Sequence, residues 1–297
     1  MSIENNKIKG ASLILGSGCM YTAMTCMIKI ASDPTSEFKA NSYQMSFIRF
    51  LVGLCVLSAL NLTGRIKLKF TNWPLLIARG VIGGVAVWIT YLAIAKLGMA
   101  KGPLILYSYP VYASLFAIFM LKEKLHPKNL VAIVFAFIGL YLLVVKTGGL
   151  NSLLTVGKYE VIAVVGAIMA GLTVTIIRKL HETESTFEIF FAQCLFGTLL
   201  MLVPATMGAH SIDNKVMMLL IGIAFTAFGG QLLATEGYRY LPVNIASVLS
   251  MAELILNCSI GVLVFSESFT LRSVAGAVLI VTACVLSLAG KVNRAKK

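Results

Sequence analysis

Long apolar runs separated by short polar gaps fill the chain between residues 10 and 290. A helix needs about 20 mostly apolar residues, at ~1.5 Å each, to cross the ~30 Å hydrocarbon layer of a bilayer. These runs are continuous and lack the alternation of a transmembrane β-barrel strand, so they predict helices. Ten segments are long enough to span: 10–30, 41–62, 74–97, 102–121, 128–146, 158–178, 186–207, 215–239, 242–265 and 270–290.

Composition agrees with this pattern and excludes a soluble protein. Of the 297 residues, 58% are hydrophobic and 12% are charged, whereas soluble domains carry about 25% charged residues. The gaps between the predicted helices are too short to hold a soluble domain. We therefore expect an all-α membrane protein.

The net charge of +13 lies in the gaps rather than on a continuous basic face. This distribution is typical of membrane-flanking loops and argues against nucleic acid as a partner. If the amino terminus lies inside, the inner segments hold fifteen Lys and Arg residues and the outer segments hold eight. The excess predicts that both termini are cytoplasmic.

The sequence contains no motif for binding a metal ion or a nucleotide. The six cysteines lie inside apolar runs without a Cys-x-x-Cys pair, and the three histidines lie in the gaps. No glycine-rich phosphate loop is present, since no Lys-Ser/Thr follows the glycines. We expect no cofactor and no metal site, and transport without direct ATP coupling if the chain is a carrier.

The chain matches itself when it is shifted by 144 residues. The shift pairs Gly53 with Gly197, Leu97 with Leu241, and the run 121–125 with the run 265–269. It predicts two related units of five helices, residues 1–147 and residues 148–297. Because five is odd, the second unit enters the membrane upside down relative to the first. Such inverted repeats enclose a site near the middle of the bilayer in transporters.

Three local motifs carry a resemblance to a known family. They are Ala78-Arg79-Gly80 at the start of the third helix, Arg49-Phe50 within the second, and the acidic residues Glu123 and Glu267 at the ends of the fourth and ninth. With them the whole chain resembles the drug/metabolite transporter superfamily, in its ten-helix EamA-domain branch. The resemblance implies a bacterial inner-membrane carrier of small metabolites, often an exporter of amino acids or their relatives. One departure is Gln193, which stands where the repeat would place a second copy of Arg49.

Glu253 is the foremost candidate for binding substrate or a proton. An ionisable group inside a membrane is costly, so its presence points to a function. Ser250 and Asn257 lie three residues before it and four after it, on the same helical face. The alternative is a polar cluster that holds helices together.

Two arginines extend the set of intramembrane charges. Arg49 lies about nine residues into its helix, hence roughly 12–14 Å below the surface, where it would pair with Glu253 or hold an anionic group. An ion pair of purely structural role is equally compatible. Arg79 lies nearer the cytoplasmic end of its helix, so we expect its side chain to reach the interface. Glu123 and Glu267 are expected at the two interfaces, in a structural or gating role.

Aromatic and amide side chains complete the candidate site. Such side chains would suit a cationic or apolar amino-acid-like solute, and lipid-facing packing is the alternative. Pro110 removes a backbone hydrogen bond inside the fourth helix and predicts a kink there. The candidates of this group are Tyr21, Trp88, Tyr91, Tyr109 and Gln231.

These features lead to ranked hypotheses. The first is a secondary carrier that exports a small amino-acid-like metabolite, with protons or an exchanged solute as the coupling partner. The second keeps the fold and proposes uptake or exchange of a larger cationic or nucleoside-linked metabolite. A membrane enzyme or scaffold is disfavoured, because the sequence holds neither a metal-ligand cluster nor a Ser/His/Asp arrangement.

Overall fold

The structure, a computed structural model, describes residues 3–33, 40–121, 157–207, 213–241, 249–267 and 270–289, with residues 131, 134–135, 138–139, 141–142 and 246. These residues are helical or lie in turns and loops, and no strand occurs among them. The helices are α1 (Ile3–Ser32), α2 (Ser42–Leu62), α3 (Trp73–Leu106), α4 (Tyr109–Leu121), α7 (Lys158–Leu180), α8 (Thr186–Thr206), α9 (Asn214–Tyr240), α11 (Met251–Leu263) and α12 (Leu271–Ala289).

Seven segments of the described chain are long and apolar enough to cross a membrane, and two shorter apolar helices lie in α11 and α12. Large apolar side chains point outward, including Phe119, Val203 and Leu263, which are 80%, 61% and 82% exposed. Lipid as the surrounding solvent accounts for that surface. The protein is therefore a multi-pass membrane protein. The predicted helix 128–146 falls largely outside the described residues.

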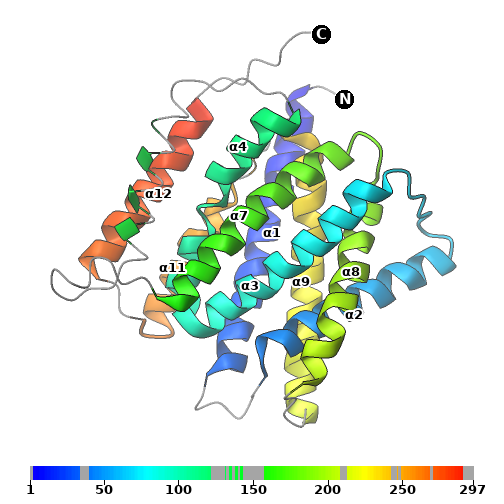
Figure 1. The fold of residues 1–297 in the computed structure, drawn as a ribbon, viewed down its shortest axis with the longest axis horizontal. Coiled ribbons are helices and arrows are strands. Elements are labelled where there is room, and N and C mark those ends of the chain that lie inside the picture. Colours follow the sequence, from blue (N-terminus) through cyan, green and yellow to red (C-terminus); the bar gives the residue numbers. More distant parts are fainter. Residues whose placement is uncertain are drawn as a thin grey trace.

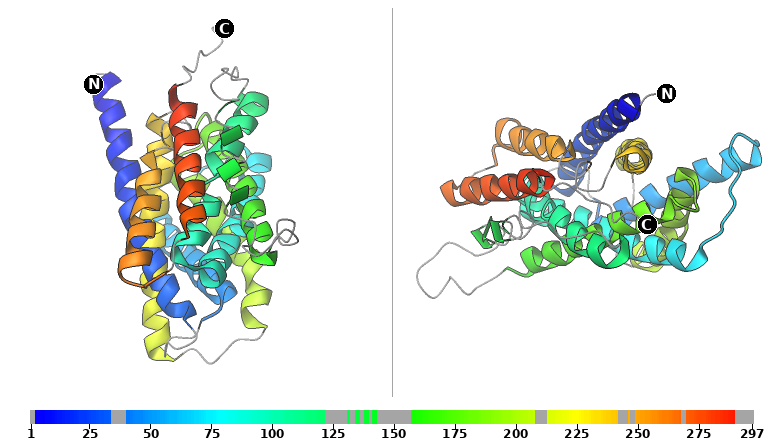
Figure 2. Two further views of the ribbon diagram at one scale, coloured as in Figure 1. Left: turned by 90° about the vertical axis from the view of Figure 1, so that its left-hand side faces the viewer. Right: turned by 90° about the horizontal axis from the view of Figure 1, so that it is seen from above.

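The helices form a bundle in which α1 and α9 run nearly along one direction, while α2, α3 and α7 are inclined to them (Figures 1 and 2). Helix α1 packs along α9, and α3 packs along both α7 and α8. We call the end where α1 begins and α9 ends the N-side, and the opposite end the far side. Helix α7 runs antiparallel to α1 (Figure 1).

Helices α2 and α8 begin in the same way and pack on each other. Each is 21 residues long and starts with a capping box, formed by Asn41 with Gln44 in one and by Ser185 with Glu188 in the other. These boxes satisfy backbone donors that a helix start otherwise leaves unpaired. Both helices thus begin at a defined residue, and the two starts are 144 residues apart in the chain.

Two glycines allow the backbones of α2 and α8 to approach closely. A Cβ atom added to Gly53 would lie 2.6 Å from Sγ of Cys194, and one added to Gly197 would lie 2.6 Å from the ring of Phe50. The two contacts are reciprocal, because Phe50 is separated from Cys194 by the same 144 residues that separate Gly53 from Gly197. Small residues at such positions give the tight packing that replaces hydrophobic driving force in lipid.

Two predicted helices are interrupted among the described residues: the first at residues 107–108, close to the kink that Pro110 predicts, and the second at Ser250, which corrects the continuous span 242–265. The first stops at Leu106 and resumes as α4 at Tyr109, since Pro110 has no N–H to bond to the preceding turn. In the second, α11 begins only at Met251, with Ser250 at its N-cap. Glu253 consequently lies in the first turn of α11 rather than in the middle of a continuous helix. Helix α3 also bends at Gly98, whose φ of 90° favours glycine.

Candidate functional site

A partly open cavity of about 210 Å³ lies at the centre of the bundle. Helices from the first and the second half of the chain line it, including α1, α2, α3, α7, α8, α9 and α11. Much of the lining is apolar, and its main polar side chains are Tyr21, Arg49, Arg79, Tyr107, Tyr109, Gln193, Gln231, Tyr238, Ser250 and Glu253. A small number of polar groups in an apolar cavity is the usual form of a small-molecule site.

Glu253 and Tyr107 join the two helix interruptions across the cavity. The hydroxyl of Tyr107, in the gap between α3 and α4, donates a hydrogen bond to the Glu253 carboxylate at the start of α11. Gly18 of α1 packs close behind, because a Cβ there would lie 3.4 Å from Cβ of Glu253. Ser250 also lines the cavity, and its hydroxyl donates to the carbonyl of Ala246 at 3.0 Å. The carboxylate thus lies at the point where both interrupted helices meet.

Arg49 is the centre of a second polar group that joins α1, α2, α3 and α9. Its Nη2 donates to Oε1 of Gln231 at 3.1 Å, and its Nη1 lies 3.4 Å from the hydroxyl of Tyr91. Tyr21 donates to the same Gln231 oxygen at 3.1 Å. Arg49 is only 4% exposed. The structure therefore brings together four of the predicted residues, although it places Tyr91 behind the arginine and not on the cavity wall.

Arg79 contradicts the expectation that its side chain reaches the interface. It is 1% exposed and lines the cavity. Its Nη2 donates to Oε1 of Gln193 on α8 at 2.8 Å. The tight contact of Gly80 with α8 explains the difference, since a Cβ at Gly80 would lie 2.7 Å from the carbonyl oxygen of Ala192. That approach directs the neighbouring arginine into the bundle.

Two tyrosines complete the aromatic wall. The hydroxyls of Tyr109 and Tyr238 lie 3.2 Å apart, and the rings of Tyr107 and Tyr109 are 5.8 Å apart. Tyr107 and Tyr238 were not among the predicted site residues. The sequence could have indicated Tyr107 as a site residue, because it lies just before the predicted kink at Pro110. Tyr238 could not be predicted in this way, because the packing of α9 against α7 and α1 brings it to the cavity.

Some predicted residues lie elsewhere. Trp88 stacks on Tyr43 with ring centroids 4.9 Å apart and does not line the cavity, so its position matches the packing interpretation. Asn257 is fully buried one turn beyond Glu253 and is also absent from the cavity wall. Pro110 lies in the first turn of α4, at the interruption. Glu123 lies outside the described residues.

A polar cluster links α1, α3 and the segment after α11 on the far side of the bundle. Lys29, at the end of α1, lies 3.1 Å from Glu267, which follows α11. Glu267 also accepts a hydrogen bond from the backbone N–H of Met99 at 2.8 Å, beside the bend at Gly98. A Cβ at Gly98 would lie 2.7 Å from the Glu267 carboxylate. Glycine is therefore required here both for the backbone conformation and for the close approach of Glu267.

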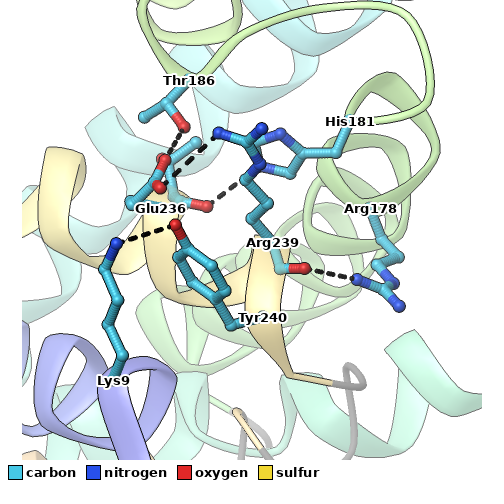
Figure 3. A network of polar contacts seen from close by, with 8 residues as sticks. Lys9, Arg178, His181, Thr186, Glu236, Arg239 and Tyr240 are labelled. Carbon is cyan, nitrogen blue, oxygen red and sulfur yellow. Dashed lines mark hydrogen bonds and ion pairs between the residues drawn. The ribbon is translucent and has the colours of Figure 1, made fainter. Parts of the chain in front are cut away.

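A larger network joins α1, α7, α8 and α9 on the N-side (Figure 3). Glu236 accepts from the hydroxyl of Thr186 at 2.5 Å and pairs with Arg239 at 3.7 Å. Arg178 donates to the carbonyl of Arg239 at 3.2 Å, and Lys9 donates to the hydroxyl of Tyr240 at 2.9 Å. Glu236 and Arg239 are thus part of a network that joins several helices.

His181 is part of the same network at the end of α7. Its Nε2 lies 3.0 Å from the carbonyl oxygen of Thr235. Burial lowers the pKa of His181 below its ordinary value of 6.5, because the charged form loses hydration. The ring is therefore neutral at pH 7, when its Nε2–H can donate to that carbonyl.

Comparisons with known proteins agree with a transporter. Two segments, residues 8–145 and 157–289, match the profile of the EamA-like transporter family. The pseudopaline exporter of Pseudomonas aeruginosa is 25% identical over 286 residues, covering 93% of this chain and 94% of that protein. The riboflavin transporter of Vibrio cholerae is 24% identical over 276 residues, covering 89% of this chain and 88% of that protein.

One solved crystal structure shares the fold, with a TM-score of 0.66 at 16% identity over 97% of this chain and 98% of the other. Among the described residues, no group of three or more His, Cys, Asp and Glu side chains could hold a metal ion. Since the profile matches most of the chain in two segments and the named relatives are transporters rather than enzymes, the protein belongs to the EamA-like transporter family.

Proposed function

We propose that this protein is a secondary active transporter that exports a small amino-acid-like metabolite across the bacterial inner membrane by alternating access. The observation that carries the proposal is the hydrogen bond between Tyr107 and Glu253, made where two interrupted helices meet at the central cavity. Interrupted helices at a central site are a recurring feature of transporters, because backbone polar groups are tolerated there when they line a cavity.

Glu253 is the proposed site for a substrate ammonium group or a coupling proton. A carboxylate at this depth costs about 2.5–3.5 kcal/mol on insertion scales for charged residues. The tyrosine hydroxyl bound to it offsets part of that cost. A cationic group or a proton arriving in the cavity would offset more, which supports a role in binding or coupling.

The proposed architecture has ten helices in two inverted five-helix units, residues 1–147 and 148–297. The separate family matches at 8–145 and 157–289 support this division. The reciprocal contacts of Gly53 with Cys194 and of Gly197 with Phe50 support a pseudo-twofold axis between α2 and α8. We place the N-side in the cytoplasm, with both termini, on the basis of the Lys and Arg excess.

Alternating access requires that the cavity open to one side at a time. The Lys29–Glu267 contact and the N-side network of Figure 3 join helices at opposite ends of the bundle, where such contacts would form and break as the cavity opens to each side. We assign Glu267 a gating role on the far side, because it ties α1 and the bend of α3 to the segment after α11.

Export is favoured over uptake by the relative from Pseudomonas aeruginosa, whose name describes an exporter. The alternative, uptake or exchange of a larger cationic or nucleoside-linked metabolite, draws support from the riboflavin transporter of Vibrio cholerae. The cavity of about 210 Å³ favours the smaller substrate.

Purified protein in proteoliposomes tests the proposal. Efflux of labelled amino acids is measured for the unchanged protein, for Glu253→Gln and for Glu182→Gln, whose side chain is an exposed carboxylate in the turn after α7. We expect Glu253→Gln to lose transport or its pH dependence and the control to retain both. Unchanged transport with unchanged pH dependence in Glu253→Gln would refute the site assignment. Competition by cationic and nucleoside-linked metabolites, but not by amino acids, would favour the alternative substrate.

A further inference from the structure

We infer that Arg79 forms an anion-binding subsite that receives a carboxylate group of the substrate. The inference rests on the proposed transport function and narrows its substrate class. It concerns a residue whose sequence position suggested only a structural role near the membrane surface. Arg79 instead lines the central cavity with 1% of its surface exposed.

The guanidinium of Arg79 has fewer hydrogen-bond acceptors around it than it has N–H donors. A guanidinium has five N–H donors and no acceptor. In the described part of the chain its Nη2 bonds to Gln193, while Nε and Nη1 are buried without a hydrogen-bond partner. Buried donors are almost always satisfied in folded proteins. Two unsatisfied nitrogens on a charged group beside a cavity therefore indicate a ligand that supplies acceptors.

The charge of Arg79 is also unpaired. None of the ion pairs among the described residues includes Arg79 or Arg49. Glu253 is the one carboxylate on the described cavity wall, and it is bonded to Tyr107. A buried charge without a counter-charge is strongly unfavourable in a low-dielectric interior. An anionic group in the cavity would supply the counter-charge.

The surroundings of Arg79 hold its guanidinium in place. Oε1 of Gln193 fixes Nη2, and Nε2 of Gln193 lies 3.4 Å from the carbonyl oxygen of Gly83. Gly83 gives the guanidinium its space, since a Cβ on this glycine would collide with Nη1. The guanidinium is therefore pre-organised to bind an anion, because a neutral amide fixes its position and leaves its charge uncompensated.

Arg49 is the less suitable subsite of the two. Both of its terminal nitrogens already face acceptors, Gln231 and Tyr91. Only its Nε lacks a partner among the described residues. Arg49 therefore contributes positive potential to the cavity, and Arg79 offers the free donors.

Together, Arg79 and Glu253 define the substrate class. The cavity lining offers donors and a positive charge at Arg79 and a carboxylate at Glu253. A molecule with a carboxylate and an amine complements both, whereas a simple amine leaves Arg79 unsatisfied. The substrate is thus a zwitterionic amino carboxylate.

The first experiment measures anion binding without knowledge of the substrate. The purified full-length protein is melted in detergent with sodium acetate or with sodium chloride at equal ionic strength. A ligand that binds the folded state raises the melting temperature with its concentration. We expect an acetate-specific rise in the unchanged protein and in Arg65→Gln, which alters an exposed loop arginine. Arg79→Gln should lose that rise.

Gln193→Glu is the second variant and preserves the shape of the site. The new carboxylate would pair with Arg79, so we expect a higher melting temperature without acetate and no acetate-specific rise. An equal rise in the unchanged protein and in both variants would overturn the inference. If Arg79→Gln does not fold, the outcome for Gln193→Glu decides.

The second experiment tests the substrate class in proteoliposomes with matched competitors. L-Phenylalanine is compared with phenethylamine, and L-histidine with histamine. We expect the acids to compete about ten- to hundredfold better than the amines, the range expected for a hydrogen bond to a charged group. Arg79→Lys should reduce this preference, because an ammonium lacks the planar donor set.

The outcomes separate the two proposals. Amines that compete as well as acids would overturn the subsite while leaving transport by Glu253 intact. An acetate effect that depends on Arg79, combined with no competition by either acid, would support the subsite and contradict the amino-acid-like substrate of the proposed function.

Discussion

The Nζ atom of Lys29 and the Oε1 atom of Glu267 lie 3.1 Å apart and link α1 to the segment that follows α11 on the far side. The Lys29 and Glu267 side chains are 26% and 15% exposed, respectively. The pair is therefore partly shielded from water and joins segments that are distant in the chain. Such a contact links these segments at one end of the bundle without fixing them permanently, because a partly exposed ion pair is weak.

A double-mutant cycle on this pair tests its strength. We expect Lys29→Met and Glu267→Gln each to lower the free energy of unfolding by about 0.5–1 kcal/mol. The double variant should lose little more than either single one, since both remove the same contact. Thermal melting in detergent measures the changes. Fully additive losses would show that the two side chains do not interact.

Tyr107→Phe tests the hydrogen bond to Glu253. Removal of the hydroxyl leaves the carboxylate without its tyrosine donor, and we expect substrate affinity or transport rate to fall about tenfold. Tyr109→Phe is the matched control, because it removes a hydroxyl that contacts Tyr238 instead of a carboxylate. Proteoliposome efflux measures both variants. Equal effects in the two would contradict a special role for the Tyr107–Glu253 contact.

The contact between Gly53 and Cys194 predicts a rescue. Gly53→Ala should destabilise the protein by about 1–3 kcal/mol, the usual cost of overpacking, because the new methyl group would lie 2.6 Å from the thiol sulfur. Cys194→Ala removes that sulfur and should restore most of the loss in the double variant. Gly16→Ala is the control, since its nearest neighbour would lie at 3.7 Å, an ordinary contact distance. If the double variant is no more stable than Gly53→Ala alone, the contact with the Cys194 sulfur is not the cause of the destabilisation.

His181 predicts a pH dependence of stability. Its pKa is lowered in the folded state by burial, so the unfolded state takes up the proton more readily as the pH falls. Its contribution to stability is therefore complete above pH 6.5 and is lost as the pH falls from about 6.5 through the folded-state pKa. Melting temperatures between pH 7.5 and 5.5 should fall less in His181→Gln than in the unchanged protein. Parallel pH profiles would contradict this.

The apolar pattern was sufficient to predict the seven spanning segments found in the described chain, because lipid leaves continuous apolar runs as the main constraint on a spanning segment. The segment 186–207 differs from the observed α8 by one residue at its end. The pattern did not predict that α11 begins only at Met251, because Asn244, Ser247 and Ser250 are single polar residues in an otherwise apolar run. Pro110 gave the corresponding signal in the first half, and the helix there does stop nearby.

The candidate site was only partly predictable, for a geometric reason. The cost of burying charge identified Glu253 and Arg49 directly, and both line the cavity. For Arg79, distance along the helix indicated a position near the surface. Its actual depth depends on which way its helix face turns, and that is set by the contact of Gly80 with α8. Spacing along one helix contains no information on that contact.

The size of the central cavity has a consequence for hydration. A cavity of about 210 Å³ has room for several water molecules, since a site of roughly 10–15 Å³ on such a measure already holds one. A solute that fills the cavity releases this water to the surrounding liquid when it binds. Binding should therefore respond to osmotic pressure: sucrose, which is too large to replace the water, lowers water activity and favours the solute-filled cavity over the hydrated one.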